Sequence, residues 1–328
     1  MTYTAGSLIQ ATDYNGFAST TVGANVNTVW GAGATDAGYG QSTTLATVAA
    51  ASTVTATQWA SLNSRISSMA SHQGTTITAR TSPVAGNLIQ ILAAVNTDLT
   101  AITTNRGNAA ASGTQNTAWT GTSSKTTATG SGNTGWTITF THTITFASAA
   151  AARYFFNAGG RIKWESNKTS TGTDADEEWN DLSSTLCGDI YITGGTGTQT
   201  IAATAYTGTT KVGGTGTPTT LATTTGWYDL TTTPVTIYKQ FADTYSYTDQ
   251  YIQVNASINV GATALILTTT WVDPGGLLSP ADNISGGTAT TGITFGTAPA
   301  TVVTYFPPST TYLTEASWGT PTVAASVV

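Results

Sequence analysis

Charged side chains are scarce in this sequence. Asp, Glu, Lys and Arg make up 8% of its 328 residues, and only two histidines accompany them. An ordinary soluble domain carries about 25% charged residues. Because acid–base and nucleophilic catalysis depend on titratable side chains, this composition argues against an enzyme. The net charge of −6 also argues against a basic surface of the kind that binds nucleic acid.

Cysteine and long apolar runs are also nearly absent. The single Cys187 excludes an intrachain disulfide and a multi-cysteine zinc site, and we interpret it as a small buried apolar residue. No apolar run approaches the ~20 residues that span a bilayer, so we expect no membrane partner. Residues 1–6 lack the charged and apolar regions of a secretory signal, which favours release from the producing cell by lysis.

Motifs for cofactors and nucleophiles are missing too. The glycine-rich segments lack the Gly-Lys-Ser/Thr ending of a phosphate loop, and there is no Gly-x-Ser-x-Gly elbow. We therefore expect no cofactor, no metal and no catalytic residue.

Threonine is the most frequent residue, supported by glycine, alanine and serine. Threonine is β-branched, suits a pleated surface and forms hydrogen bonds without carrying charge. Aromatic residues make up 9% of the chain, including nine tryptophans, which argues against disorder. The composition predicts an extended, β-rich structural protein that is extracellular or carried on a particle.

Two helical patterns occur in the first 110 residues. A capping box at Thr55–Gln58 precedes the first, and a second helix is expected to begin near Ser82-Pro83. The apolar positions are Trp59, Leu62, Ile66 and Met69 in the first, and Leu88, Leu92, Val95, Leu99 and Ile102 in the second. These heptad-like stripes fit an intrachain hairpin, which is the simpler reading, or a bundle around an oligomer axis.

A strict alternation of apolar residues and threonine over Trp136–Phe146 predicts a half-buried strand, with His142 on its buried face. In Arg161–Glu165 the charged residues are expected to point outward. Further strands are predicted at 189–193, 234–241, 252–260 and 262–272. Val235, Ile237 and Lys239 are expected to share one face of the strand at 234–241. Short strands separated by turns predict an antiparallel sandwich.

The expected organisation has four parts. These are an N-terminal region with two short helices (1–112), a Ser/Gly/Thr-rich linker (113–134), a β-sandwich (135–280) and an extended arm or additional strands (281–328). The predicted fold class is α+β, with a partly helical N-terminal region followed by a mainly antiparallel β-sandwich or jelly-roll-like domain.

Two clusters are candidate sites. The carboxylates are Asp174, Asp176, Glu177, Glu178 and Asp181. An EF-hand counted from Asp174 needs glycine at its sixth position, where this chain has Trp179, so a solvated loop is the simpler interpretation. Tyr245, Tyr247 and Tyr251 could contact a partner or a glycan, or could pack within the sheet or on a neighbouring subunit.

The phrase Arg153–Ile162, with the alternating strand before it, resembles virion structural proteins of tailed bacteriophages, of the tail-fibre and neck-appendage type. The phrases at 11–15, 39–41 and 57–59 are similar to the same group, so the resemblance covers roughly the first 105 residues and residues 136–165. It implies an N-terminal region that attaches to the particle, an outward β domain and a homo-oligomer, with a homotrimer favoured. It implies no catalytic residues.

Three hypotheses follow. The first is a tail or neck fibre or appendage subunit located in the virion, whose partners are itself and other virion proteins. The second is a capsid decoration or ring component. The third is a carbohydrate-binding adhesin that would use the Tyr245–Tyr251 surface to bind a host-surface glycan.

Overall fold

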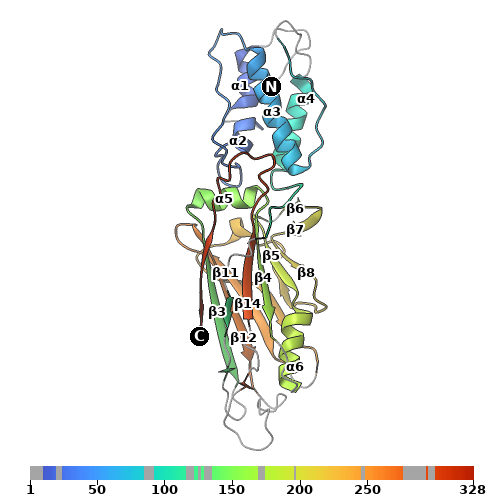
Figure 1. The fold of residues 1–328 in the computed structure, drawn as a ribbon, viewed down its shortest axis with the longest axis vertical. Helices are drawn as coiled ribbons and strands as arrows, with labels where there is room; N and C mark the ends of the chain where they lie inside the picture. The colour runs from blue at the N-terminus through green and yellow to red at the C-terminus, as the bar shows by residue number, and fades with distance from the viewer. Residues whose placement is uncertain are drawn as a thin grey trace, which may run out of the picture.

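The computed structural model describes residues 10–19, 24–84, 92–115, 122–124, 127–128, 135–168, 174–195, 197–244, 248–275, 293–294 and 300–328. The fold is α+β, as the sequence predicted, with a helical N-terminal region followed by an antiparallel β-sandwich. The helical bundle stacks on one end of the sandwich, and the molecule is elongated along the line that joins them (Figure 1). No helix among the described residues is long and apolar enough to cross a membrane.

Four helices form the bundle. They are α1 (Ala11–Ala18), α2 (Val26–Trp30), α3 (Ala56–Gln73) and α4 (Leu92–Thr104). The predicted capping box begins α3: the Gln58 N–H donates to the Thr55 hydroxyl at 3.3 Å, and the Thr55 N–H donates to the Gln58 side chain at 2.8 Å. The predicted apolar stripe of α3 is buried, so the periodicity identified its core face correctly.

The predicted start of the second helix is wrong, because residues 81–84 are not helical and α4 begins at Leu92. Asp98 of α4 instead bonds the segment that precedes Ser82. Its carboxylate accepts the Thr78 N–H at 3.2 Å and forms an ion pair with Arg80, whose side chain is buried. These contacts hold residues 78–80 against α4.

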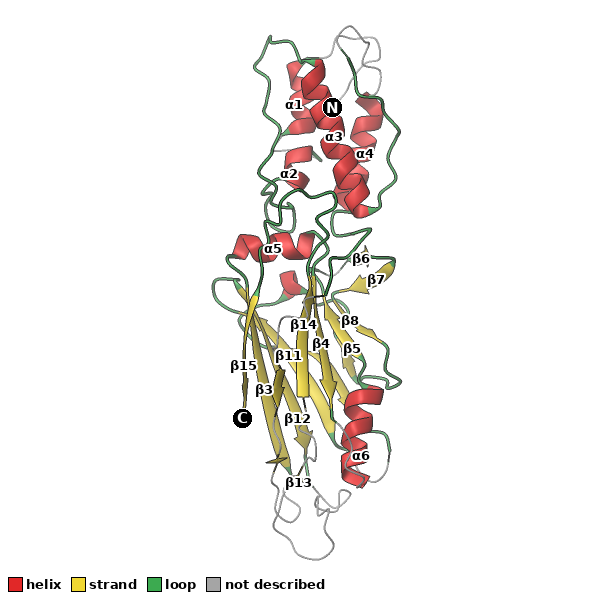
Figure 2. Ribbon diagram, in the orientation of Figure 1, coloured by secondary structure: helices red, strands yellow, loops and turns green. Residues whose placement is uncertain are grey.

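The β domain contains two large antiparallel sheets (Figure 2). In spatial order, one sheet contains β1 (Thr122–Ser124), β14 (Ala300–Phe306), β4 (Arg161–Asn167), β5 (Asp189–Ile192) and β8 (Thr209–Val212). The other contains β15 (Thr322–Val327), β3 (Trp136–Thr145), β12 (Ala264–Asp273), β11 (Tyr251–Ile258), β10 (Val235–Phe241) and β9 (Thr220–Leu221). Two small antiparallel pairs complete the described strands. A hairpin joins β6 (Thr198–Ile201) to β7 (Thr204–Thr207), and β2 (Thr127–Ala128) pairs with the distant β13 (Ile293–Thr294).

Alternation along β3 places Ile138, Phe140 and Ile144 in the sandwich core, and His142 is buried with them as predicted. The alternation predicted for β10 is wrong. A register shift between Thr236 and Tyr238 marks a bulge, so the adjacent Ile237 and Tyr238 are both buried.

Helices in the β domain escaped the sequence analysis. Phe155 and Phe156 belong to the helix α5 (Ala149–Asn157), which Ser148 caps through its hydroxyl. Gly159 follows with a φ of +87°, and a Cβ there would lie 2.6 Å from that of Ala109, so glycine is required for the turn into β4. The helix α6 (Asp174–Asn180) continues into a π-helical turn, η1 (Asp181–Leu186).

Two basic residues of β4 are buried, although the sequence pattern predicted that they face solvent. The Arg161 guanidinium lies over the rings of Tyr191, Tyr206 and Phe306, at 4.3 to 5.6 Å from their centroids. Tyr206 comes from β7, so the β6–β7 hairpin covers this part of the outer sheet face. Lys163 forms ion pairs with Glu165 and Asp189.

The C-terminal segment connects both sheets to the bundle. It contributes β14 to one sheet, passes the helical region, and then contributes β15 to the other (Figure 1). Between the strands, the Gln41 amide accepts the Glu315 N–H at 2.9 Å and donates to the Glu315 carbonyl at 2.8 Å. The Ser42 N–H donates to the Glu315 carboxylate, and Trp318 is buried. This segment therefore holds the bundle in contact with the sandwich.

The substitution Gln41→Ala should destabilise the protein. It removes both partners of the Glu315 backbone groups at a buried position, and each unsatisfied group costs about 1–3 kcal/mol. Urea unfolding should show a loss of about 2 kcal/mol or more, whereas Thr311→Ala at an exposed position should change stability by about 0.5 kcal/mol or less. Equal unfolding midpoints for the two variants would contradict the role assigned to Gln41.

Candidate functional site: the joint between bundle and sandwich

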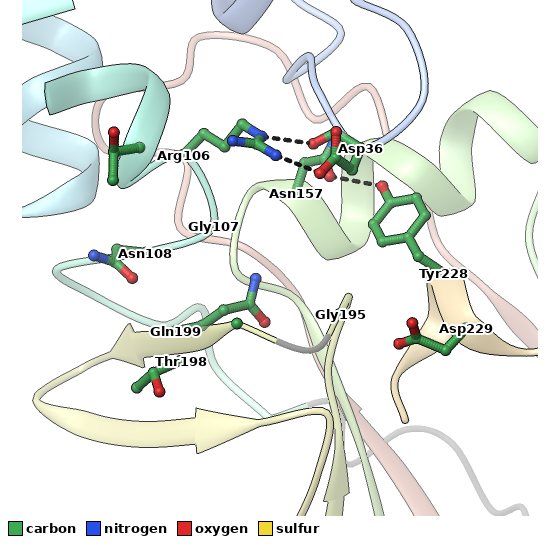
Figure 3. A pocket seen from close by; sticks show the side chains of 12 residues that line it. Asp36, Arg106, Gly107, Asn108, Asn157, Gly195, Thr198, Gln199, Tyr228 and Asp229 are labelled. Carbon is green, nitrogen blue, oxygen red and sulfur yellow. Dashed lines mark hydrogen bonds and ion pairs between the residues drawn. The ribbon is translucent and has the colours of Figure 1, made fainter. Parts of the chain in front are cut away.

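A cavity of about 310 Å³ lies where the helical bundle meets the β-sandwich. Asp36 and Arg106 line it from the helical region, and Asn157, Gln199 and Tyr228 line it from the β domain (Figure 3). Pockets of this size that join two parts of a chain are common binding sites. This cavity is therefore the candidate site that the geometry offers.

Arg106 lies just after α4 and forms the hydrogen bonds of the joint on the helical side. Its Nε donates to the Asp36 carbonyl at 3.0 Å, and its Nη1 donates to the Thr103 carbonyl at 2.9 Å. The remaining terminal nitrogen forms an ion pair with the Asp36 carboxylate (Figure 3). The guanidinium is thus engaged by three acceptors and fixes the loop that contains Asp36.

Asn157, at the end of α5, forms hydrogen bonds at the joint from the side of the β domain. Its Nδ2 donates to the Gly38 carbonyl at 2.9 Å, and its Oδ1 accepts the Tyr228 hydroxyl at 2.6 Å. Tyr228 lies in the short turn η2 (Trp227–Asp229), and burial raises the pKa of its hydroxyl. The hydroxyl therefore remains protonated and continues to donate to Asn157 at neutral pH.

His72 at the end of α3 forms a third link. Its Nε2 lies 3.1 Å from the Ala158 carbonyl, and its ring meets that of Tyr39 edge-on at 5.2 Å. Burial lowers the pKa of His72 to about 4, so the ring is neutral at pH 7. A neutral imidazole with Nε2 protonated donates to that carbonyl, which makes His72 a structural link between bundle and sandwich.

The joint is well suited to hold two parts of the chain together. On the helical side the Arg106 guanidinium pairs with the Asp36 carboxylate, and on the β side the Tyr228 phenol donates to the Asn157 amide. The Asn157 amide then links the two sides through the Gly38 carbonyl. Among the described residues, no group of three or more His, Cys, Asp or Glu side chains is placed to hold a metal ion. The polar side chains that line the cavity and face its open space can form hydrogen bonds with a small polar molecule.

The acidic cluster is not the solvated loop that the sequence suggested. Glu178 lies on α6 and is fully buried, and its Oε2 accepts the Thr244 hydroxyl at 2.5 Å. Its Oε1 has no hydrogen-bond partner in the described part of the chain. Burial raises the pKa of Glu178, and the nearby Asp181 and Asp243 raise it further. The side chains of Asp174 and Asp176 lie outside the described residues.

Tryptophans explain why this helix is buried. The Trp179 ring stacks on Trp271 of β12 at 5.4 Å, and it also contacts Trp136 of β3 at 5.0 Å. The helix α6 thus closes the core at the end of the sandwich away from the bundle (Figure 1). Cys187, which follows η1, is fully buried as interpreted, and burial raises the pKa of its thiol to about 11.

The structure does not assemble the tyrosine surface from the described residues. Tyr251 is half-buried in β11, with its ring 5.2 Å from that of Phe241 and the Lys239 ammonium 3.6 Å above it. Its described contacts therefore lie within its own sheet. Tyr245 and Tyr247 lie outside the described residues.

The apolar stripe of α4 packs inside its own chain. Val95, Leu99 and Ile102 are at most 2% exposed and belong to the same core as the α3 stripe. These three side chains therefore act as helix-packing contacts and are not free to form an oligomer axis. Leu88 and the side chain of Leu92 lie outside the described residues.

The sequence analysis missed the residues that make the joint. Asn157 lies within the phrase that carries the phage resemblance, but Asp36, Arg106 and Tyr228 are isolated residues in loops and turns. Their spacing follows no period, so only the folded chain brings them together. Comparisons with protein-family models, curated proteins and solved structures find no match.

The substitution Glu178→Gln should stabilise the protein at pH 8. A carboxyl with a raised pKa in the folded state favours folding below its unfolded pKa, and this contribution is lost as pH rises through the folded pKa. Glutamine removes the buried charge and can still accept from Thr244. The melting temperature should rise by a few degrees at pH 8, and the difference should shrink at pH 4.

The neighbouring Glu177→Gln provides the matched control, because it makes the same charge change at a half-buried position. It should not reproduce the gain at pH 8. If Glu178→Gln melts at the wild-type temperature at both pH values, burial does not disfavour the charged form of Glu178, and the interpretation is wrong.

Proposed function

We propose that this chain is a structural protein of a bacteriophage virion, an appendage subunit of the tail or neck. Its helical bundle would dock on the particle, its β-sandwich would project, and copies of the chain would associate with one another. The observation that carries the proposal is the joint between the two parts. Buried hydrogen bonds from His72, Asn157 and Gln41 hold the bundle and sandwich in line, as an elongated subunit requires.

The outer face of the six-stranded sheet supports an assembly role. Cross-strand neighbours there include Thr139 with Thr270 and Thr141 with Thr268, and Ser326 lies opposite Thr141 on the other side of β3. Hydroxyl groups can be buried between subunits when they form hydrogen bonds, whereas charged groups there would need ionic partners. On β3, β12 and β15 this face is rich in hydroxyl groups and has no charged side chain, which suits side-by-side packing in a particle.

The phage resemblance supports the direction of attachment. Its N-terminal phrases lie in the bundle, and the Arg153–Ile162 phrase includes α5, which supplies Asn157 to the joint. The resemblance therefore spans both parts of the molecule and the contact between them.

Epitope insertions at the two ends of the molecule test this proposal. One epitope is inserted after Ala50, in the exposed loop before α3, and one beside the exposed Thr248, in the loop between β10 and β11. Antibody should bind both epitopes in the free protein. On purified phage particles it should bind only the epitope beside Thr248, and electron microscopy should locate it on the tail or neck.

Other labelling patterns would overturn parts of this proposal. Label over the whole capsid lattice would replace the appendage with a decoration protein. Label at the Ala50 epitope alone would reverse the direction of attachment. Particles that contain no copy of the chain by mass spectrometry would exclude a virion role.

A further inference from the structure

Among the described residues, β15 is an edge strand that is paired on one side only. It pairs with β3 alone, and it lies at the margin of the β domain, where Figure 2 shows no strand beyond it. The strand β1 of the opposite sheet is near this margin but is paired with β14. Five of the seven residues 322–328 are exposed, in contrast to the buried core-facing residues of β3 beside them.

The register shows which backbone groups of β15 point outward. Val328 and Thr139 exchange both of their N–H to carbonyl bonds at 2.9 Å. Since bonded and non-bonded pairs alternate in an antiparallel ladder, Ser326, Ala324 and Thr322 also point their backbone groups at β3. The N–H and carbonyl groups of Val323, Ala325 and Val327 therefore point away from the sheet. No hydrogen bond to them is formed within the described part of the chain.

The edge lacks the features that usually prevent strands from pairing. Residues 322–328 contain no charged side chain and no proline, and their ladder with β3 has no bulge. The core is also incompletely covered here. Ile144, His142 and Phe140 are fully buried on β3, but their partners Val323 and Val327 are only half-buried and Ala325 is exposed.

We propose that β15 pairs antiparallel with β15 of a second copy of this chain, about a two-fold axis at Ala325. This register places Val323 opposite Val327 of the other copy, and Ala325 opposite its own counterpart. All three residues have outward backbone groups, so every open donor meets an acceptor. The strand has no charged side chain, so side chains of the two copies meet without repulsion, and the added strand covers the half-buried valines.

The two six-stranded sheets then form one continuous sheet across the pair. A second copy suits this edge because the outward positions 323, 325 and 327 are symmetric about Ala325, so two copies related by a two-fold axis match every donor to an acceptor and bring Val323 against Val327. The contact deepens the self-association included in the proposed function and rests on that part alone. It replaces the homotrimer that the resemblance favours with a two-fold pair. The antibody experiment on particles reports the virion role and gives its result whether or not this pair forms.

Opposite charges at the axis provide the test. In this register the two residues at 325 lie directly opposite each other, where like charges destabilise strand pairing. Light scattering of the full chain should detect a dimer for wild type. Ala325→Lys and Ala325→Glu should each raise the dimer dissociation constant about tenfold or more. An equal mixture of the two variants should restore association as a mixed dimer.

Ala325 is exposed in the single chain, so both variants should fold, which is checked by their melting temperatures. Val84→Lys, at a 63% exposed position in the helical region, adds the same charge elsewhere and should dimerise like wild type. Wild-type protein that stays monomeric at all concentrations overturns the proposal. Association that survives both substitutions overturns it as well, and a mixture that fails to associate overturns the two-fold register.

Discussion

The structure depends on the passage of its C-terminal segment from one sheet to the other by way of the helical bundle. The strand β14 lies inside the first sheet, β15 completes the described edge of the second, and the residues between them bond to Gln41 and Ser42. Folding of the sandwich is therefore coupled to docking of the bundle. The links made by His72 and Asn157 act in the same place, so the two parts share one buried boundary.

Several of the few basic side chains in the described part of the chain are engaged inside the molecule. Arg80 and Lys163 form ion pairs at buried or half-buried positions, Arg161 lies over three aromatic rings, and Arg65 lies 4.5 Å over the ring of Trp30. Buried basic groups need such partners because an unpaired charge loses its hydration. The consequence for function is a surface rich in hydroxyl groups. Such a surface can be covered by other subunits at low electrostatic cost.

In the proposed function the edge strand and the joint have separate tasks. The joint fixes the direction of the sandwich relative to the bundle, and β15 offers backbone groups to another chain. These two features lie on different parts of the molecule, so a change at Ala325 leaves the joint intact. Orientation and self-association can therefore be separated by mutation.

Local signals in the sequence were sufficient for several elements. The helix after Thr55 follows from its capping box and stripe, and β3 follows from strict alternation, since both signals involve residues close in sequence. Helix α5 was missed because its alanines and adjacent phenylalanines show no clear period. The bulge in β10 was missed because a register shift depends on the partner strand.

The sequence by itself determined the α+β class, the core face of α3, the antiparallel strands and the burial of His142 and Cys187. Tertiary structure alone decided the burial of Arg161 and Glu178, the cavity at the joint and the open edge of β15. The physical reason is separation along the chain. Local periodicity states which face of an element is apolar, but which distant segment covers that face, or leaves it open, is settled only when the whole chain packs.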